Sequence, residues 1–354
     1  MITQQRQSRF RPDPTRHTAM QVSDRDLGII LTTLHHPFLT INEIRQLHFS
    51  VDNGYKATAR RLQMLWNAGF LKRQWIPTLM GSSPAIYTAS QAGVQLLLEA
   101  GRIIPEELPS NGLVASTTMR HELTVNKFAT AVMVEIAERY GLWRYDVSPT
   151  RSEGDCPTRR LDLDRLSEIL CVEGGSHLWD YVANTDSTEK ARHLHIPIRP
   201  DRLLVLKLND SWKTFFLEVE IAAKSQTRFR QRVRGYRAYY SSDGFLRRYG
   251  EGEDRTQYPF HVLVTVPTEE RRNNLIELAI REKTLRMCWF AIYDEAVTDP
   301  LGQVWIRGEE YATAIAGLSE QEKARMYRTH RRIERDVFIR QHIKRFSILE
   351  GEGM

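Results

Sequence analysis

The 354-residue sequence has only three cysteines, Cys156, Cys171 and Cys288, and no Cys-x-x-Cys pair. Three scattered thiols do not make a disulfide framework or a structural zinc site, so we expect reduced thiols in a cytoplasmic protein. No apolar run approaches the roughly 20 residues of a membrane-spanning helix. The first residues carry positive charge but no apolar segment, which excludes a signal peptide and predicts a disordered basic arm over residues 1–22.

The composition is that of a globular protein, with 41% hydrophobic and 27% charged residues. The length allows two or three domains, each with its own core. Lysine and arginine number 50 against 44 aspartate and glutamate, a formal net charge of +6. A moderate positive excess is typical of proteins with polyanionic partners, and no membrane partner is expected.

Residues 23–102 have the pattern of a small helical domain with one hairpin. Thr40 stands three residues before Glu43, the spacing of a capping box at a helix start. The apolar positions of "ATARRLQMLW" recur at helical spacing, and Gly69 follows where the left-handed cap conformation ends a helix. The segments "FLKRQW" and "AIYTAS" predict two short strands, and a closing helix follows. This order predicts a winged helix-turn-helix.

In a winged helix-turn-helix the third helix lies in the major groove of DNA and the wing contacts the backbone or minor groove. We therefore expect double-stranded DNA as the partner, with a basic third helix facing it. The predicted DNA-facing residues are Tyr55, Lys56, Thr58, Arg60 and Arg61 on the helix, and Lys72 and Arg73 at the base of the wing. A helical domain that docks another protein is the alternative.

A segment rich in proline, glycine and serine over residues 103–118 predicts a linker. Residues 119–312 then predict a mixed α/β domain in the order α-β-β-β-α-β-α-β, with a polar, irregular insertion over residues 149–197. Residues 313–354 predict a basic helix and a tail. That helix either contacts phosphates or packs on a second subunit, so a homodimer is left open. The fold class is α/β (α+β overall).

Three carboxylates are expected to meet in the second domain. Glu218 and Glu220 project from one face of a strand, and Asp201 opens the strand before it. Close carboxylates raise one another's pKa unless a cation neutralises them, and Mg²⁺ or Mn²⁺ is the usual cation. The pattern is that of metal-dependent nucleases that end a strand in Glu-x-Lys, but Glu220 stands in place of the lysine. Lys224 or Arg232 would supply the missing cation.

The alternative is a polar strand face paired with arginines of the next helix. Residues 224–248 hold eight lysines and arginines against one acidic residue, with tyrosines interleaved. Such a helix is typical of a nucleic-acid groove, and Arg228, Arg234 and Tyr236 are the predicted contacts. Part of the tyrosine set is expected in the core.

The chain resembles the replication-relaxation family of plasmid and mobile-element proteins, which includes relaxases of the MobC type. The resemblance rests on "ATARRLQMLWNAGFLKR…AIYTASQAG", "RHELTVNKFATAV", "RPD" and "FFLEVEIAAKSQTRFRQRVRGYRAYY". It implies a C-terminal domain with a PD-(D/E)xK nuclease-like fold, in which Asp201, Glu218 and Glu220 match the active-site positions.

The resemblance also implies a role in plasmid replication and DNA relaxation, together with other replication or mobilisation proteins. Three candidate functions follow from the sequence. The first is metal-dependent nicking of DNA at an origin on a plasmid or mobile element. The second is a non-catalytic DNA-binding accessory factor or transcriptional repressor with a degenerate nuclease-like scaffold. A protein-interaction adaptor is a third, whose binding would be insensitive to salt.

Overall fold

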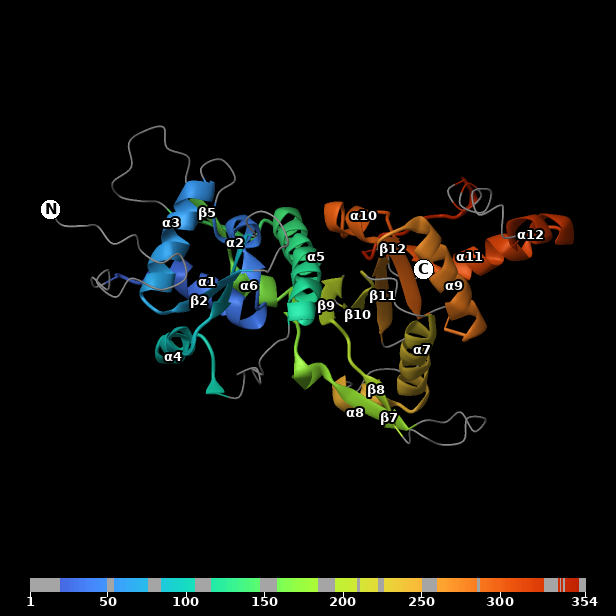
Figure 1. Cartoon of the computed structure of the whole chain (residues 1–354), viewed down its shortest axis with the longest axis horizontal. Helices are drawn as coiled ribbons and strands as arrows, with labels where there is room; N and C mark the ends of the chain where they lie inside the picture. The colour runs from blue at the N-terminus through green and yellow to red at the C-terminus, as the bar shows by residue number, and fades with distance from the viewer. Residues whose placement is uncertain are drawn as a thin grey trace. The chain divides into compact units, whose positions relative to one another are not determined.

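The computed structural model describes residues 20–49, 54–75, 84–105, 116–146, 158–183, 195–208, 211–221, 226–249, 260–284, 287–327, 337, 339 and 341–349. The chain divides into two compact units, Met1–Ser167 and Glu168–Met354. Helices and strands occur in both (Figure 1), which confirms the mixed fold class. Within the described residues, no helix is long and apolar enough to cross a membrane. Most of the predicted basic arm lies outside the described residues.

Unit 1 contains a helical core and two small sheets. Its elements are α1 (Asp24–His35), β1 (Leu39–Thr40), α2 (Ile41–His48), α3 (Gly54–Asn67), β2 (Leu71–Trp75), β3 (Ala85–Ala89), α4 (Gln91–Glu99), α5 (Ser116–Tyr140), β4 (Trp143–Asp146), β5 (Thr158–Leu161) and α6 (Leu163–Ser167). The antiparallel strands lie in the order β1-β3-β2, and β4 pairs with β5.

Local sequence signals set the ends of the first helices. The Thr40 hydroxyl and the Glu43 carboxylate form the predicted capping box of α2. Gly69 has φ = +81°, and the Phe70 amide donates to the Leu65 carbonyl 3.0 Å away, so the predicted left-handed cap ends α3. The β2–β3 hairpin forms over the predicted strands, while its tip lies outside the described residues.

The boundary between the units falls later than the sequence suggested. We assigned the long helix after residue 118 to the second domain, but α5 contacts α2 and β1. Its Asn126 amide donates to the Pro37 carbonyl 2.6 Å away. Hydrophobic residues of α5, such as Phe128 and Ile136, are fully buried. Packing of this apolar face therefore keeps α5 within unit 1.

Unit 2 is built on one six-stranded sheet. Its elements are β6 (Leu170–Glu173), the 3₁₀ helix η3 (Ser176–Leu178), β7 (Asp180–Ala183), β8 (His195–Ile198), β9 (Arg202–Leu208), β10 (Ser211–Val219), α7 (Gln226–Ser241), α8 (Gly244–Tyr249), β11 (His261–Val266), α9 (Glu269–Arg281), β12 (Cys288–Ile292), α10 (Tyr293–Thr298), β13 (Ile306–Arg307), α11 (Gly308–Ala316) and α12 (Glu320–Tyr327).

The six strands lie in the order β13-β12-β11-β10-β9-β6, and β7 pairs with β8 in a separate hairpin. Strands β10, β11 and β12 are parallel, and the remaining pairs of the large sheet are antiparallel. Two expectations were wrong here. The segment expected as the first strand of this domain is β4, which pairs with β5 in unit 1. The region that we called an irregular insertion supplies β6, which pairs with β9.

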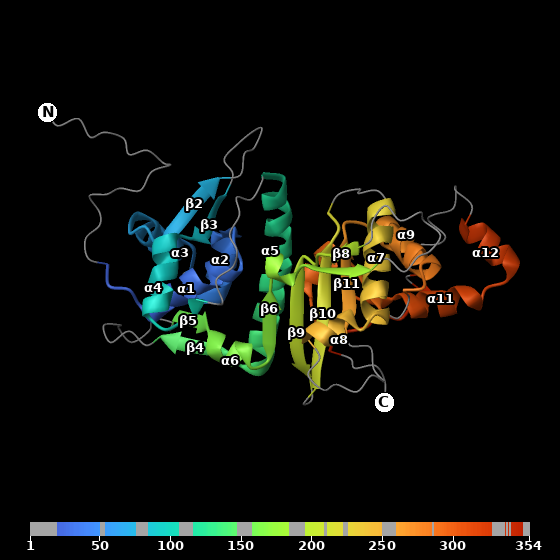
Figure 2. The same ribbon diagram turned by 90° about the horizontal axis from the view of Figure 1, so that it is seen from below.

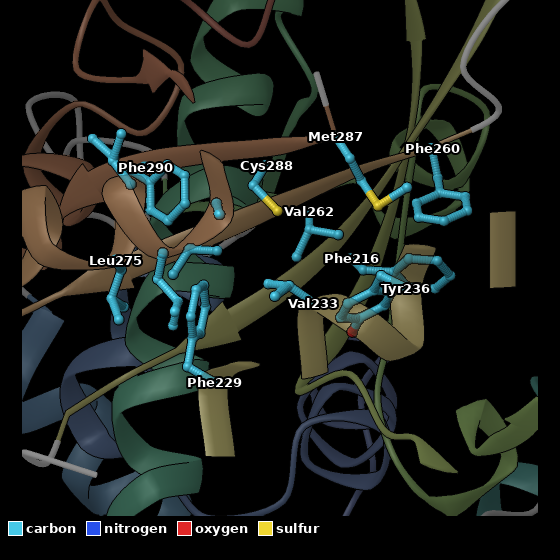
Figure 3. Packing of buried hydrophobic residues seen from close by; sticks show 14 of the residues in the cluster. Phe216, Phe229, Val233, Tyr236, Phe260, Val262, Leu275, Met287, Cys288 and Phe290 are labelled. Atoms are coloured by element: carbon cyan, nitrogen blue, oxygen red, sulfur yellow. The ribbon is translucent and has the colours of Figure 1, made fainter. Parts of the chain in front are cut away.

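One face of the large sheet is covered by α7 and α9, which lie side by side (Figure 2). Figure 3 shows the core between them, with Phe216 of β10, Tyr236 of α7, Val262 of β11, Leu275 of α9 and Phe290 of β12 in one cluster. Because side chains alternate along β10, residues 216, 218 and 220 share this helix-covered face. The acidic pair at the end of β10, Glu218 and Glu220, is therefore placed at the edge of a hydrophobic core.

The predicted C-terminal helix is described only in part. Helix α12 covers its first residues, and residues 328–336 lie outside the described residues. Farther on, Ile339 and Ile343 are buried in the hydrophobic cluster of unit 2. The Trp305 and Phe346 backbones pair in an antiparallel bridge. The chain after α12 therefore returns to the core of unit 2.

Candidate active site and nucleic-acid interface

Strand pairing places Asp201 beside the acidic end of β10. Arg202, the first residue of β9, pairs with Leu217 of β10. One residue earlier, the Asp201 amide donates to the Leu217 carbonyl 2.9 Å away. The Asp201 carboxylate accepts a hydrogen bond from the Val219 amide, with 2.7 Å between Oδ2 and N. The aspartate therefore closes the β9–β10 ladder next to the two glutamates.

Both glutamates are buried. Their side chains are 2% exposed at Glu218 and 1% exposed at Glu220. The Glu220 amide is also fixed, because it donates to the Thr265 carbonyl of β11 at 2.8 Å. The end of β10 is thus hydrogen-bonded to β9 on one side and to β11 on the other. The distance between the two glutamate side chains is set by the two-residue repeat of the strand.

A single guanidinium joins the two carboxylates. Arg232 lies in the second turn of α7, and its Nη1 is 2.5 Å from Glu218 Oε2 and 2.7 Å from Glu220 Oε1. The glutamates raise the pKa of Arg232, so its positive charge is permanent. Arg232 is the cation that we predicted to reach back from the helix. Lys224, the other predicted cation, lies outside the described residues.

Tyr236 completes the cluster, one turn after Arg232. Its hydroxyl donates to Glu218 Oε1 at 2.7 Å, and burial raises the pKa of the phenol well above its usual value. We expected Tyr236 to contact DNA, which is wrong, because the side chain is 2% exposed and packs on Phe216. The i, i+4 spacing from Arg232 places both donors on the helix face that meets β10.

Burial raises the pKa of the Glu218 carboxyl to about 7. The Arg232 charge opposes this shift, and the Asp201 charge adds to it. Glu218 therefore changes its protonation near neutral pH. Glu220 differs in its hydrogen bonding, since its buried Oε2 atom has no hydrogen-bond partner among the described residues.

The donor set suits a hard divalent cation in chemistry. Asp201, Glu218 and Glu220 offer only carboxylate oxygens, and the Glu220 oxygen without a partner is available as a ligand. Mg²⁺ is commonly held by one or two carboxylates plus water. In the described part of the chain, however, no group of three or more acidic, histidine or cysteine side chains is arranged to hold a metal ion. The three-carboxylate metal site therefore stays a prediction.

The rest of α7 divides between exposed and paired arginines. Arg228 is exposed, as expected for a DNA contact. Arg234 instead turns to the end of α9, where its Nε donates to Glu282 Oε2 at 2.6 Å. Arg230 lies 3.1 Å from the other oxygen of Glu282. The positive charge of this helix is thus partly used to join α7 to α9.

In unit 1, the predicted DNA-facing residues also divide into exposed residues and residues that are buried or paired within the protein. Tyr55, Lys56 and Arg60 are exposed on α3. Thr58 is fully buried, and its hydroxyl donates to the Gly54 carbonyl, so the expectation that it faces DNA is wrong. Arg61 is held by a buried partner, with 2.6 Å between its Nε and Asp26 Oδ1.

The two predicted DNA-facing residues of β2 also differ from each other. Lys72 of β2 is exposed. Arg73 points back, with its guanidinium 3.5 Å from the centre of the Trp66 ring and its Nη1 2.7 Å from Gln63 Oε1. Of the predicted DNA-facing basic residues of unit 1, Lys56, Arg60 and Lys72 are therefore the exposed ones.

Sequence reasoning missed a charged pocket in unit 1. Among the residues that line it are Asp24, Arg102, Arg144, Arg160 and Asp164. Arg160 lies 2.5 Å from Asp24, and Arg144 lies 3.0 Å from Asp164. These residues are far apart in sequence, and nothing in their local spacing could have shown that they meet.

Three comparisons place the chain among known proteins. The family model described as replication-relaxation matches residues 31–254. No curated protein matches the chain in sequence. Among solved structures, the restriction endonuclease FokI is similar with a TM-score of 0.24 and 11% identity, over 85% of this chain and 66% of that one. The structure of FokI bound to DNA gives 0.25 and 13%, over 88% of this chain and 49% of that one. At these scores the likeness is weak.

Proposed function

Because the chain belongs to the replication-relaxation family, we propose that it acts on DNA by nicking one strand at an origin on a plasmid or mobile element. The observation that supports this proposal most directly is the buried pair of Glu218 and Glu220 around the Arg232 guanidinium. Mg²⁺ or Mn²⁺ is the proposed cofactor. Double-stranded DNA is the proposed substrate.

The energetics of the cluster favour a functional origin for it. Taking carboxylates out of water costs several kcal/mol for each ion. A protein with apolar side chains of the same volume in their place is often at least as stable. Here two carboxylates are buried where Phe216 and Val264 already provide a hydrophobic face. A carboxyl whose pKa is raised to about 7 is also a common feature of active sites.

Each member of the cluster has a proposed role. Asp201, Glu218 and Glu220 are the proposed metal ligands, although their described positions do not form a ready three-ligand site. A bound ion would activate water and stabilise the leaving oxygen of the phosphodiester. Arg232 would take the role of the lysine that the Glu-x-Lys pattern supplies, and its guanidinium would stabilise charge that develops on the phosphate. Tyr236 orients Glu218 through its hydrogen bond at 2.7 Å.

DNA binding is proposed for the exposed basic residues of both units. In unit 1 we propose that α3 and the β2–β3 hairpin act as the recognition helix and wing of a winged helix-turn-helix. Lys56, Arg60 and Lys72 would contact phosphates or base edges, with Tyr55 beside them. In unit 2, Arg228 at the start of α7 would contact the same DNA.

A supercoiled cognate plasmid provides the test. Wild-type protein with Mn²⁺ is expected to convert the plasmid to the open circular form, and the double variant Glu218→Gln, Glu220→Gln is expected to leave it supercoiled. Glu282→Gln is the matched control, because Glu282 is also a buried glutamate that pairs with arginines of α7. Nicking by the double variant at the wild-type rate would refute the assigned site.

One observation favours a second candidate, a non-catalytic accessory factor or repressor. Arg232 bonds to both glutamates, so a group of the chain itself already supplies one positive charge against their two carboxylates. In that case the wild-type protein would bind the plasmid and leave it supercoiled with Mn²⁺ and with Mg²⁺. Gel shift and nicking assays on the same preparation separate the two functions.

A further inference from the structure

The hairpin of β7 and β8 presents two large aromatic side chains to solvent. Asp180 and Val182 point toward the body of unit 2, where Val182 joins the hydrophobic cluster. Trp179 and Tyr181 alternate with them, and they are 46% and 55% exposed. Pro197, opposite Tyr181 on β8, is also exposed and extends the same outer face.

A cation lies over both rings. Arg199 follows β8, and its guanidinium lies 4.5 Å from the centre of the Trp179 ring and 6.0 Å from that of Tyr181. Its Nη2 also donates to the Tyr181 hydroxyl at 3.1 Å. These contacts hold both rings in a defined orientation while their outer surfaces stay open to solvent.

The hairpin is fixed to the helix that carries Arg232. The Tyr239 hydroxyl of α7 donates to Asp180 Oδ2 at 2.9 Å. Gly235 lets the hairpin approach α7 closely, because a Cβ atom there would lie 3.0 Å from Ile198 Cδ1. The outer face of the hairpin therefore keeps a constant position relative to the acidic cluster.

The charge of this face suits an anionic partner. Arg248 of α8 donates from Nη1 to the Trp179 carbonyl at 3.0 Å and lies 3.5 Å from Asp180 Oδ2. The Asp180 carboxylate is thus balanced by Arg248, which leaves the Arg199 charge to dominate beside the aromatic rings. Exposed aromatic rings beside arginines are typical of surfaces on which unpaired bases stack, because every base has an aromatic face.

We propose that Trp179, Tyr181 and Arg199 form a stacking platform for unpaired bases of single-stranded DNA. The inference deepens the proposed nicking function, on which it rests for the choice of DNA, by naming an unpaired strand as part of the substrate. Bases in a duplex are stacked on one another, so the platform is specific for a strand that has been melted or displaced.

The test is the affinity of the full-length protein for a fluorescein-labelled single-stranded oligonucleotide of mixed sequence. Anisotropy is measured in EDTA, so that cleavage plays no part. Loss of one stacked base costs about 1–3 kcal/mol, so Trp179→Ala and Tyr181→Ala are each expected to weaken binding about 5-fold to 150-fold. Trp179→Phe, which keeps an aromatic face, is expected to retain most of the affinity.

Trp212 provides a matched control on the same unit. It is 46% exposed and has a lysine beside it, with Lys207 Nζ 5.9 Å from the ring centre. Trp212→Ala is expected to change the affinity less than twofold. Circular dichroism of each variant checks the fold.

Equal affinity of Trp179→Ala, Trp212→Ala and wild-type protein for the single strand would overturn the platform, as would equal losses on single-stranded and duplex DNA. The proposed function fails by a separate route. If wild-type protein binds the single strand through Trp179 but never nicks a plasmid, the platform stands and the nicking proposal falls. If nicking depends on Glu218 while Trp179→Ala binds normally, the reverse holds.

Discussion

Replacing Arg232 by methionine tests what the arginine does for the acidic cluster. Methionine keeps an unbranched side chain in the same space but removes the charge, so Glu218 and Glu220 lose their shared cation. Both carboxylates are at most 2% exposed, so water cannot replace the guanidinium without opening the core. Removing one partner of a buried ion pair costs about 3–5 kcal/mol, and we expect a loss in the free energy of unfolding of that size.

The loss depends on pH and on metal. A carboxyl that takes up a proton no longer needs a cation, so the destabilisation by Arg232→Met is expected to be largest above pH 7 and smaller near pH 5. If the carboxylates bind Mn²⁺, the ion replaces the missing charge. At a concentration 100-fold above its Kd, a ligand of the native state restores about 2.7 kcal/mol.

The assay is urea unfolding at pH 8 in EDTA and in Mn²⁺, with hydrogen exchange of peptides from β10 and β11 to report on unit 2 alone. Arg234→Met is the matched control. Arg234 lies on the same helix and is 31% exposed, close to the 29% of Arg232, but it pairs with one carboxylate that is 10% exposed. Its expected loss is about 1 kcal/mol, with no effect of metal.

Two results would refute this reasoning. A loss for Arg232→Met no larger than that for Arg234→Met would show that the buried carboxylates do not depend on the guanidinium. A full loss that Mn²⁺ leaves unchanged would remove the proposed metal site and favour the non-catalytic candidate.

Other predictions concern pH and salt. The folded-state pKa of Glu218, about 7, lies above its unfolded value of 4.5, so this group stabilises the protein below pH 4.5 and loses that contribution as pH rises to 7. The free energy of unfolding, measured in urea, should therefore depend less on pH over this range in Glu218→Gln than in the wild-type protein. Burial, followed by the charges of two nearby arginines, lowers the pKa of His48 from 6.5 to about 3. The unfolded state therefore takes up a proton first, stability falls as pH drops below 6.5, and His48→Gln should reduce that fall. If Lys56 and Arg60 contact phosphates, alanine at each should reduce the slope of log affinity against log salt by about 1 in duplex-binding titrations; unchanged slopes would exclude such contacts.

Much of the local structure could be predicted because its causes are local. Thr40 and Glu43 form a capping box through contacts three residues apart, and Gly69 ends α3 because it has no Cβ atom to resist a positive φ. The basic helix α7 followed from a run of residues with helical spacing. For these elements the sequence neighbours are also the structural neighbours.

The prediction failed where distant segments compete for the same place. The polar region that looked irregular supplies β6, because the edge of β9 offers it a hydrogen-bonding partner. The strand β4 was expected in the second domain but pairs with β5 in unit 1. Both are four-residue strands, too short for a pattern of alternation to say which sheet they join.

The amino-acid order alone determined that Glu218 and Glu220 share a strand face, that Arg232 and Tyr236 share a helix face, and that the region between residues 224 and 248 is strongly basic. Only the tertiary structure decided how these faces combine. Packing of α7 on β10 turned Arg232 and Tyr236 inward to the glutamates and left Arg228 outside. The sequence shows which charged groups are present, but burial decides whether each one contacts water, a partner or a ligand. Burial depends on segments far away in the chain, so the local charge pattern does not reveal it.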